Sequence, residues 1–185
     1  MTHHIHWKAV ARWAFVTASC ASLSCFCPRI DSRPPQFEAK YVLKSLLRDK
    51  QTTFSRQQNY DTAFESLFMQ PEFSNRYLYV FSASGPAQDR TQPPDGGVHT
   101  ILLADPRARS KPDNDSILAG IPPSVLASAG VDGSCPACDF TIVSAGNADE
   151  DATIDVWSIS TKRRTIGDED IPAGVPFNHI SDQDH

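Results

Sequence analysis

The spacing of apolar residues changes along the chain from the period of a helix to the period of a strand. From Pro35 to about residue 58, apolar side chains recur at helical spacing, and charged residues fill the positions between them. The apolar positions are Phe37, Tyr41, Val42, Leu46, Leu47 and Phe54. After Arg76 the alternation has a period of two, so Tyr77, Tyr79 and Phe81 share one face of a predicted strand. One helix followed by strands predicts an α+β fold, with the helix packed on an antiparallel sheet of about four strands.

The predicted sheet spans roughly residues 76–160. Its strands are the segments 76–81, 98–103, 140–145 and 153–159, in which β-branched and aromatic residues are frequent. The polar link 146–152 predicts that the last two strands form an antiparallel hairpin. A short helix is expected around residues 62–68, and the residues after 160 are expected to form a C-terminal tail.

Residues 1–30 have the character of a targeting segment. Lys8 and Arg12 precede an uncharged run from Trp13 to Pro28. This run is shorter than the roughly 20 apolar residues of a spanning helix, so it fits an export signal better than a membrane anchor. Cys20 and Cys25 leave a lipoprotein anchor as a further alternative. We therefore expect an export signal or membrane anchor at residues 1–30 and one small head at residues 31–185.

The charge and the motif content argue against two large classes of function. The formal net charge is −5, and lysine and arginine form no basic stripe, which argues against nucleic acid as a partner. The sequence contains no Gly-x-Ser-x-Gly, no phosphate-binding glycine loop and no His-Glu-x-x-His. The sequence therefore predicts a protein that is not an enzyme and has no organic cofactor.

A Cys-x-x-Cys motif at Cys135 and Cys138 is the first candidate site. This spacing occurs in redox motifs, in half of a zinc site and in small structural disulfides. A redox motif belongs at a strand-to-helix junction, whereas this one lies in a loop that runs into a strand. Zinc needs four ligands, and the other cysteines all lie in residues 1–30. We therefore predict a structural disulfide, consistent with an exported protein.

The acidic link between the last two predicted strands is the second candidate site. Three of its residues, and one residue of the predicted strand that follows, match positions 1, 3, 5 and 9 of a calcium loop, where alternate oxygens converge on the cation. These residues are Asn147, Asp149 and Asp151 in the link and Asp155 in the strand. Ala152 replaces the glycine of position 6, and Ser158 replaces the glutamate of position 12. Ca²⁺ binding is therefore one hypothesis, and a solvent-facing acidic turn is the alternative.

Several segments, in this order along the chain, together resemble a known family. They are Glu38-Ala39-Lys40 with the helix that follows, Tyr60, Asn75 to Tyr79, Ala145 to Ile159, and Ile171 to Asn178. This ordered set is similar to the type IV pilins of deltaproteobacteria, myxobacteria especially, and the resemblance covers roughly residues 36–182. It implies a long N-terminal helix on an antiparallel sheet. It also implies polymerisation into fibres anchored in the cell envelope.

The same resemblance implies partners and a location. A pilin or pseudopilin contacts other pilin subunits, the pilus or secretion assembly machinery, and the inner membrane through its N-terminal segment. Such fibres serve motility, adhesion or secretion. This chain lacks the Gly-Phe-x-x-x-Glu motif of pilins, has Lys8 near the place of the glutamate, and carries a helix-breaking Pro34-Pro35. The sequence therefore fits a minor or diverged pilin, or alternatively a secreted monomeric binding module with a pilin-like head, which calcium would stabilise.

Overall fold

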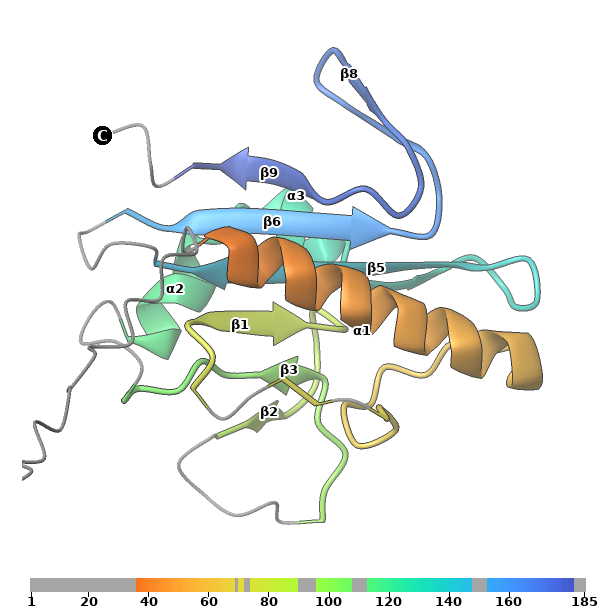
Figure 1. Ribbon diagram of the computed structural model, residues 1–185, viewed down its shortest axis with the longest axis horizontal. Coiled ribbons are helices and arrows are strands. Elements are labelled where there is room, and N and C mark those ends of the chain that lie inside the picture. Colours follow the sequence, from red (N-terminus) through yellow and green to blue (C-terminus); the bar gives the residue numbers. More distant parts are fainter. Residues whose placement is uncertain are drawn as a thin grey trace, which may run out of the picture. The chain divides into compact units, whose positions relative to one another are not determined.

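The computed structural model describes residues 36–68, 70–71, 74–89, 96–107, 113–147 and 153–181. The predicted export or anchor segment at residues 1–30 lies outside these ranges. The head is α+β, as the sequence predicts, and helix α1 (Gln36–Gln57) lies across one face of the main sheet (Figure 1). The helix lies within the expected bounds of about 35–58.

Two short helices and nine strands follow α1 in the described residues. They are β1 (Tyr77–Val80), β2 (Ala87–Gln88), β3 (Ile101–Leu102), α2 (Asn114–Gly120), α3 (Pro123–Ala127), β4 (Gly130–Asp132), β5 (Asp139–Gly146), β6 (Asp155–Ser160), β7 (Arg164–Ile166), β8 (Glu169–Ile171) and β9 (Phe177–Ile180). Asp113 caps the N-terminus of α2, because its side chain accepts a hydrogen bond from Ser116 N. Pro123 occupies the first turn of α3, where its missing N–H costs no hydrogen bond.

The main sheet is larger than predicted. Within the described residues it has seven strands, in the order β2-β3-β1-β5-β6-β9, and β4 pairs with β5. The four predicted strands are its central members β3, β1, β5 and β6, and the predicted β5–β6 hairpin is antiparallel, with Thr141 opposite Ser160. The pairing of β2 with β3 is parallel, which makes the sheet mixed. The expectation of about four strands is therefore corrected to seven.

The residues after 160 are not a tail. Strands β7 and β8 form a separate two-stranded hairpin, and β9 extends the main sheet by pairing with β6. Figure 1 shows the β7–β8 hairpin standing away from the main sheet. The expected short helix at residues 62–68 is also absent from the structure, which has turns there.

Both faces of the main sheet are covered. The face toward α1 carries the predicted aromatic row Tyr77, Tyr79 and Phe81, which packs with Leu43 and Leu46 of the helix. The alternate residues of the same strands face the other way and pack with α2 and α3; they include Leu78, Val80, Val143 and Val156. A period of two therefore accounts for both hydrophobic clusters, one on each side of the sheet.

The buried stripe of α1 is rotated from its predicted position. Its buried members are Gln36, Ala39, Leu43, Leu46, Leu47 and Lys50. Phe37 and Tyr41 were expected in the core, but they are 43% and 58% exposed and stack on each other at 5.8 Å. Ala39 takes the place against the sheet, where a small side chain lets the helix approach closely. None of the described helices is both long and apolar enough to cross a membrane.

Candidate functional site

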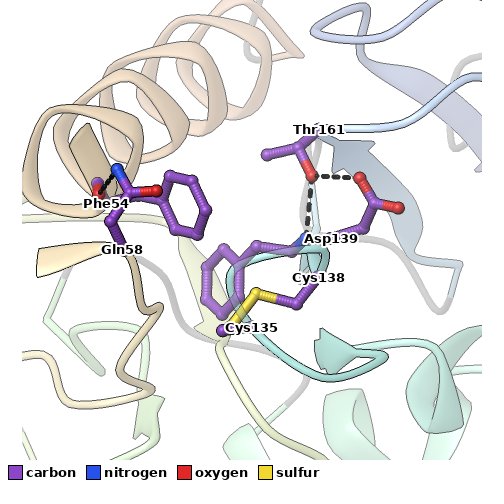
Figure 2. Close-up of a disulfide and its surroundings, with 7 residues drawn as sticks. Phe54, Gln58, Cys135, Cys138, Asp139 and Thr161 are labelled. Carbon is purple, nitrogen blue, oxygen red and sulfur yellow. Dashed lines mark hydrogen bonds between the residues drawn. A yellow bond between two sulfur atoms is a disulfide. The ribbon is translucent and has the colours of Figure 1, made fainter.

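The predicted disulfide is present between Cys135 and Cys138, whose Cα atoms are 4.5 Å apart (Figure 2). It lies in the turn between β4 and β5, and Cys138 comes directly before the first residue of β5. Cys138 is 9% exposed, and Cys135 packs against the hydrophobic cluster that faces α1. Because the two sulfurs are bonded to each other, the motif offers no thiolate for redox chemistry or for zinc in this state.

The end of α1 and the start of β5 meet beside this disulfide. Phe54 stacks on Tyr60 at 4.3 Å, and Tyr60 stacks on Phe140 at 5.2 Å. Thr161 Oγ1 accepts a hydrogen bond from Phe140 N at 2.8 Å and donates one to Asp139 Oδ1 at 3.0 Å (Figure 2). The disulfide therefore closes a packed aromatic corner of the head, which is a structural role.

Lys50 is a buried cation, although the charged residues of this helix are expected between its apolar positions. Its Nζ donates to Asp61 Oδ1, Ala63 O and Ser66 Oγ, each at 2.8 Å, and lies 4.9 Å from the Phe81 ring centroid. The residue is 1% exposed, and this burial lowers the pKa of Lys50 against the opposing effect of Asp61. Burial acts to raise the pKa of Asp61, but the hydrogen bonds from Lys50, Ser66 and the backbone N of Ala63, together with the charge of Lys50, outweigh it and the net direction is down.

A second pair of contacts holds the segment 60–68 that Lys50 binds. Asp49 Oδ2 accepts from Phe68 N at 2.7 Å, and Glu65 Oε1 lies 2.6 Å from His99 Nδ1. The segment is thus fixed both to α1 and to the residues that precede β3. The sequence carried one signal for this, because Lys50 falls four residues after Leu46, on the apolar stripe of the helix.

The first turn of α1 is attached to the middle of the sheet through buried polar groups. Gln36 Nε2 donates to Asp155 Oδ1 at 2.8 Å, and Tyr77 Oη donates to Asp155 Oδ2 at 2.7 Å. Glu38 Oε1 accepts from the backbone N of Arg76 at 2.8 Å. Burial and the neighbouring carboxylate of Asp155 raise the pKa of Tyr77 well above its ordinary value. These contacts join the start of the helix to β1 and β6.

Two of the four predicted calcium ligands, Asn147 and Asp155, lie in the described residues, and each bonds to other groups of the head. Asp155 is fully buried in β6 and bonds to Tyr77 and Gln36, and Asn147 Nδ2 donates to Thr153 O at 2.8 Å. Asp149 and Asp151 lie outside the described residues. In the described part of the chain, no three His, Cys, Asp or Glu side chains are grouped as metal ligands would be. Calcium binding stays a prediction, which a melting temperature lowered by chelator would support.

The head has an α+β fold. Its long helix packs along a mixed, largely antiparallel sheet and is attached to the sheet by buried polar contacts. The chain is 32% identical to the type IV major pilin protein PilA of Myxococcus xanthus (strain DK1622) in an alignment 182 positions long, which covers 83% of this chain and 80% of the relative. It therefore belongs to the type IV pilin family, as the resemblance predicted. No family model matches the chain. Membership in this family makes the chain a structural protein.

Proposed function

We propose that this chain is a structural subunit of a type IV pilus or of a related pseudopilus. The observation that carries the proposal is its relationship to a major pilin over 83% of the chain. The fold supports the proposal, because α1 comes before the strands in the chain and packs along their sheet, as in a pilin head. The proposed partners are other pilin subunits and the assembly machinery of a pilus or secretion system.

The proposed mode of attachment uses residues 1–30. These residues act in this proposal as an inner-membrane anchor before assembly, and the mature subunit lies in the cell envelope or in an extracellular fibre. The missing Gly-Phe-x-x-x-Glu motif supports a minor or diverged subunit over a major one. Its role in motility, adhesion or secretion follows from the fibre that contains it.

The test is the intact mass of the native protein in sheared-surface, membrane and soluble envelope fractions. A mass that retains the run from Trp13 to Pro28, recovered with the sheared fibres, is the expected result. Val16→Asp places a charge inside that run and is expected to remove the protein from the membrane and fibre fractions. Ser32→Asp places the same charge outside the run and serves as the matched control, which is expected to keep the distribution of the natural protein.

The opposite result has an equally definite meaning. A mass that corresponds to a chain beginning near residues 21–25, found in the soluble fraction alone, would contradict assembly through the N-terminal segment. It would favour the secreted monomeric module, which keeps the head and loses the segment that joins it to a fibre.

A further inference from the structure

Arg164, the first residue of β7, is a half-buried cation at the base of the β7–β8 hairpin. Its Nη1 donates to Ser158 Oγ at 2.7 Å, and its Nη2 lies 3.4 Å from Ser158 O. Ser158 is fully buried in β6. Burial lowers the pKa of Arg164. The two contacts to Ser158 fix the orientation of the guanidinium group on the sheet.

Arg164 has no acidic partner among the described residues. The ion pairs that lysine and arginine make there are Lys50–Asp61, Arg107–Asp105, Lys162–Asp132 and Arg163–Asp170. The Nε of Arg164 is buried and has no hydrogen-bond partner. A charge taken partly out of water without a counter-charge is unfavourable, and a buried polar group without a partner often marks an ion or water that completes the site.

His179 of β9 provides a second donor beside this cation. Its Nε2 lies 2.7 Å from Ser158 Oγ. Arginine can only donate, so Ser158 Oγ accepts from Arg164. Within the described residues the other hydrogen bond of Ser158 Oγ is to His179, so its buried hydroxyl proton goes to Nε2 of a neutral His179. The ring proton then resides on Nδ1, which makes no hydrogen bond to the described residues and can donate to a ligand. Burial and the charge of Arg164 lower the pKa of His179 to about 4.

We propose that Arg164 and His179 form the receiving half of an oxyanion-binding site. The ligand is a compact oxyanion, either a dissolved ion of the sulfate or phosphate type or a carboxylate from a second copy of this chain. The chain carries suitable carboxylates, because Asp168 and Glu169 are exposed at the end of the β7–β8 hairpin and make no ion pair within the described residues. The site goes beyond the proposed function, since it belongs to the head whether or not the head is assembled.

The first experiment titrates the purified full-length chain with sodium sulfate against sodium chloride at equal ionic strength. The readout is the pKa of His179, followed by NMR of its imidazole. Arg164 is the charged group that acts on this ring in the described residues, and the Phe177 ring packs edge-on at 5.0 Å. A bound anion stabilises the imidazolium, so sulfate is expected to raise the pKa of His179 by about one unit. Sulfate also raises the melting temperature of most proteins, so melting alone is not a sufficient readout.

Two glutamine variants separate a site from a general salt effect. Arg164→Gln removes the cation and is expected to abolish the sulfate-dependent shift of the His179 pKa. Arg163→Gln is the matched control, because Arg163 is 69% exposed and pairs with Asp170, and it is expected to keep the shift. If Arg164→Gln does not fold, the natural chain still decides the question. A His179 pKa that sulfate leaves unchanged, or that changes equally in both variants, overturns the proposal.

A dilution series then distinguishes the two sources of the anion. If the ligand is a carboxylate of a second copy, the His179 pKa rises with protein concentration in the absence of sulfate. The double variant Asp168→Asn/Glu169→Gln is expected to remove that rise and to keep the response to sulfate. If the ligand is a dissolved ion, only sulfate moves the pKa. Either result supports the site, and a His179 pKa that does not respond to sulfate contradicts it.

Discussion

Replacing Lys50 by methionine tests whether the buried ammonium holds the segment 60–68 on α1. The side chain is 1% exposed and makes three hydrogen bonds of 2.8 Å, one of them to the carboxylate of Asp61. Methionine keeps most of the volume of the lysine stem, so the cavity term is small. What it removes is the charge and the three donated hydrogen bonds.

The expected loss of stability follows from the burial of the two partners. Removing one member of a buried ion pair costs about 3–5 kcal/mol, chiefly because the other charge is left without a partner. Here the side chain of Asp61 is 35% exposed and can be rehydrated, which reduces the cost. The carbonyl of Ala63 still accepts from Ser66 Oγ at 2.9 Å. We therefore expect Lys50→Met to lower the free energy of unfolding by about 2–3 kcal/mol.

The assay is urea unfolding followed by far-ultraviolet circular dichroism. Lys44→Met, on the exposed side of the same helix, is the matched control and is expected to change stability by less than about 0.5 kcal/mol. The double variant Lys50→Met/Asp61→Asn is expected to be more stable than Lys50→Met alone, because it leaves no uncompensated carboxylate. A loss below about 1 kcal/mol for Lys50→Met, or an equal loss for Lys44→Met, would refute this reasoning.

Three further predictions address other parts of the head. Since the folded-state pKa of His179 is about 4 and its ordinary value is 6.5, the unfolded chain takes up a proton first as the pH falls through this window. Stability should therefore fall by about 1–2 kcal/mol between pH 6.5 and pH 4, after allowance for partial exposure, and His179→Gln should flatten this part of the stability–pH curve. A Cβ on Gly146 would lie 2.6 Å from Tyr77 Cδ1, so Gly146→Ala should cost about 1–3 kcal/mol in a urea titration. Gly120→Ala, which meets only the movable end of Ile154, should cost less; equal losses would contradict the argument. Replacing both cysteines of the disulfide by serine should cost about 2 kcal/mol or less, because the closed loop is very short; a loss above about 4 kcal/mol would assign it a larger role.

The sequence predicts the helices and strands that are long enough to show a repeated apolar pattern. Helix α1 and strands β1, β5 and β6 each carry several turns or alternations of apolar residues, and their positions are confirmed. Strand β2 has two residues, and β4, β7 and β8 have three each. A period cannot be established in two or three residues. These strands depend on hydrogen bonds from a neighbour that the sequence does not identify.

Whether a candidate site could be predicted depends on how far apart its residues lie along the chain. The disulfide could be predicted because its cysteines are three residues apart and need no tertiary information. The hydrogen bond from Gln36 to Asp155 joins residues 119 apart, and the spacing of Asp155 from Asn147, Asp149 and Asp151 grouped it with candidate calcium ligands instead. The rotation of α1 has a similar cause. Phe37 and Tyr41 satisfy a helical period, but stacking on each other lets both rings stay at the surface while Ala39 meets the sheet.

The attachment of α1 at both ends determines how tension in the proposed fibre would be transmitted to the head. Force that arrives through the residues before Gln36 enters at the first turn of α1, which bonds to Asp155 in β6 and, through Glu38, to the backbone of Arg76 before β1. Strands β1 and β6 both pair with β5, so the load reaches the centre of the sheet from two sides. Lys50 and the aromatic corner beside the disulfide hold the far half of the helix. Peeling α1 from the sheet therefore requires breaking buried polar bonds at one end before the apolar stripe can separate, and helix and sheet should respond to tension as one unit.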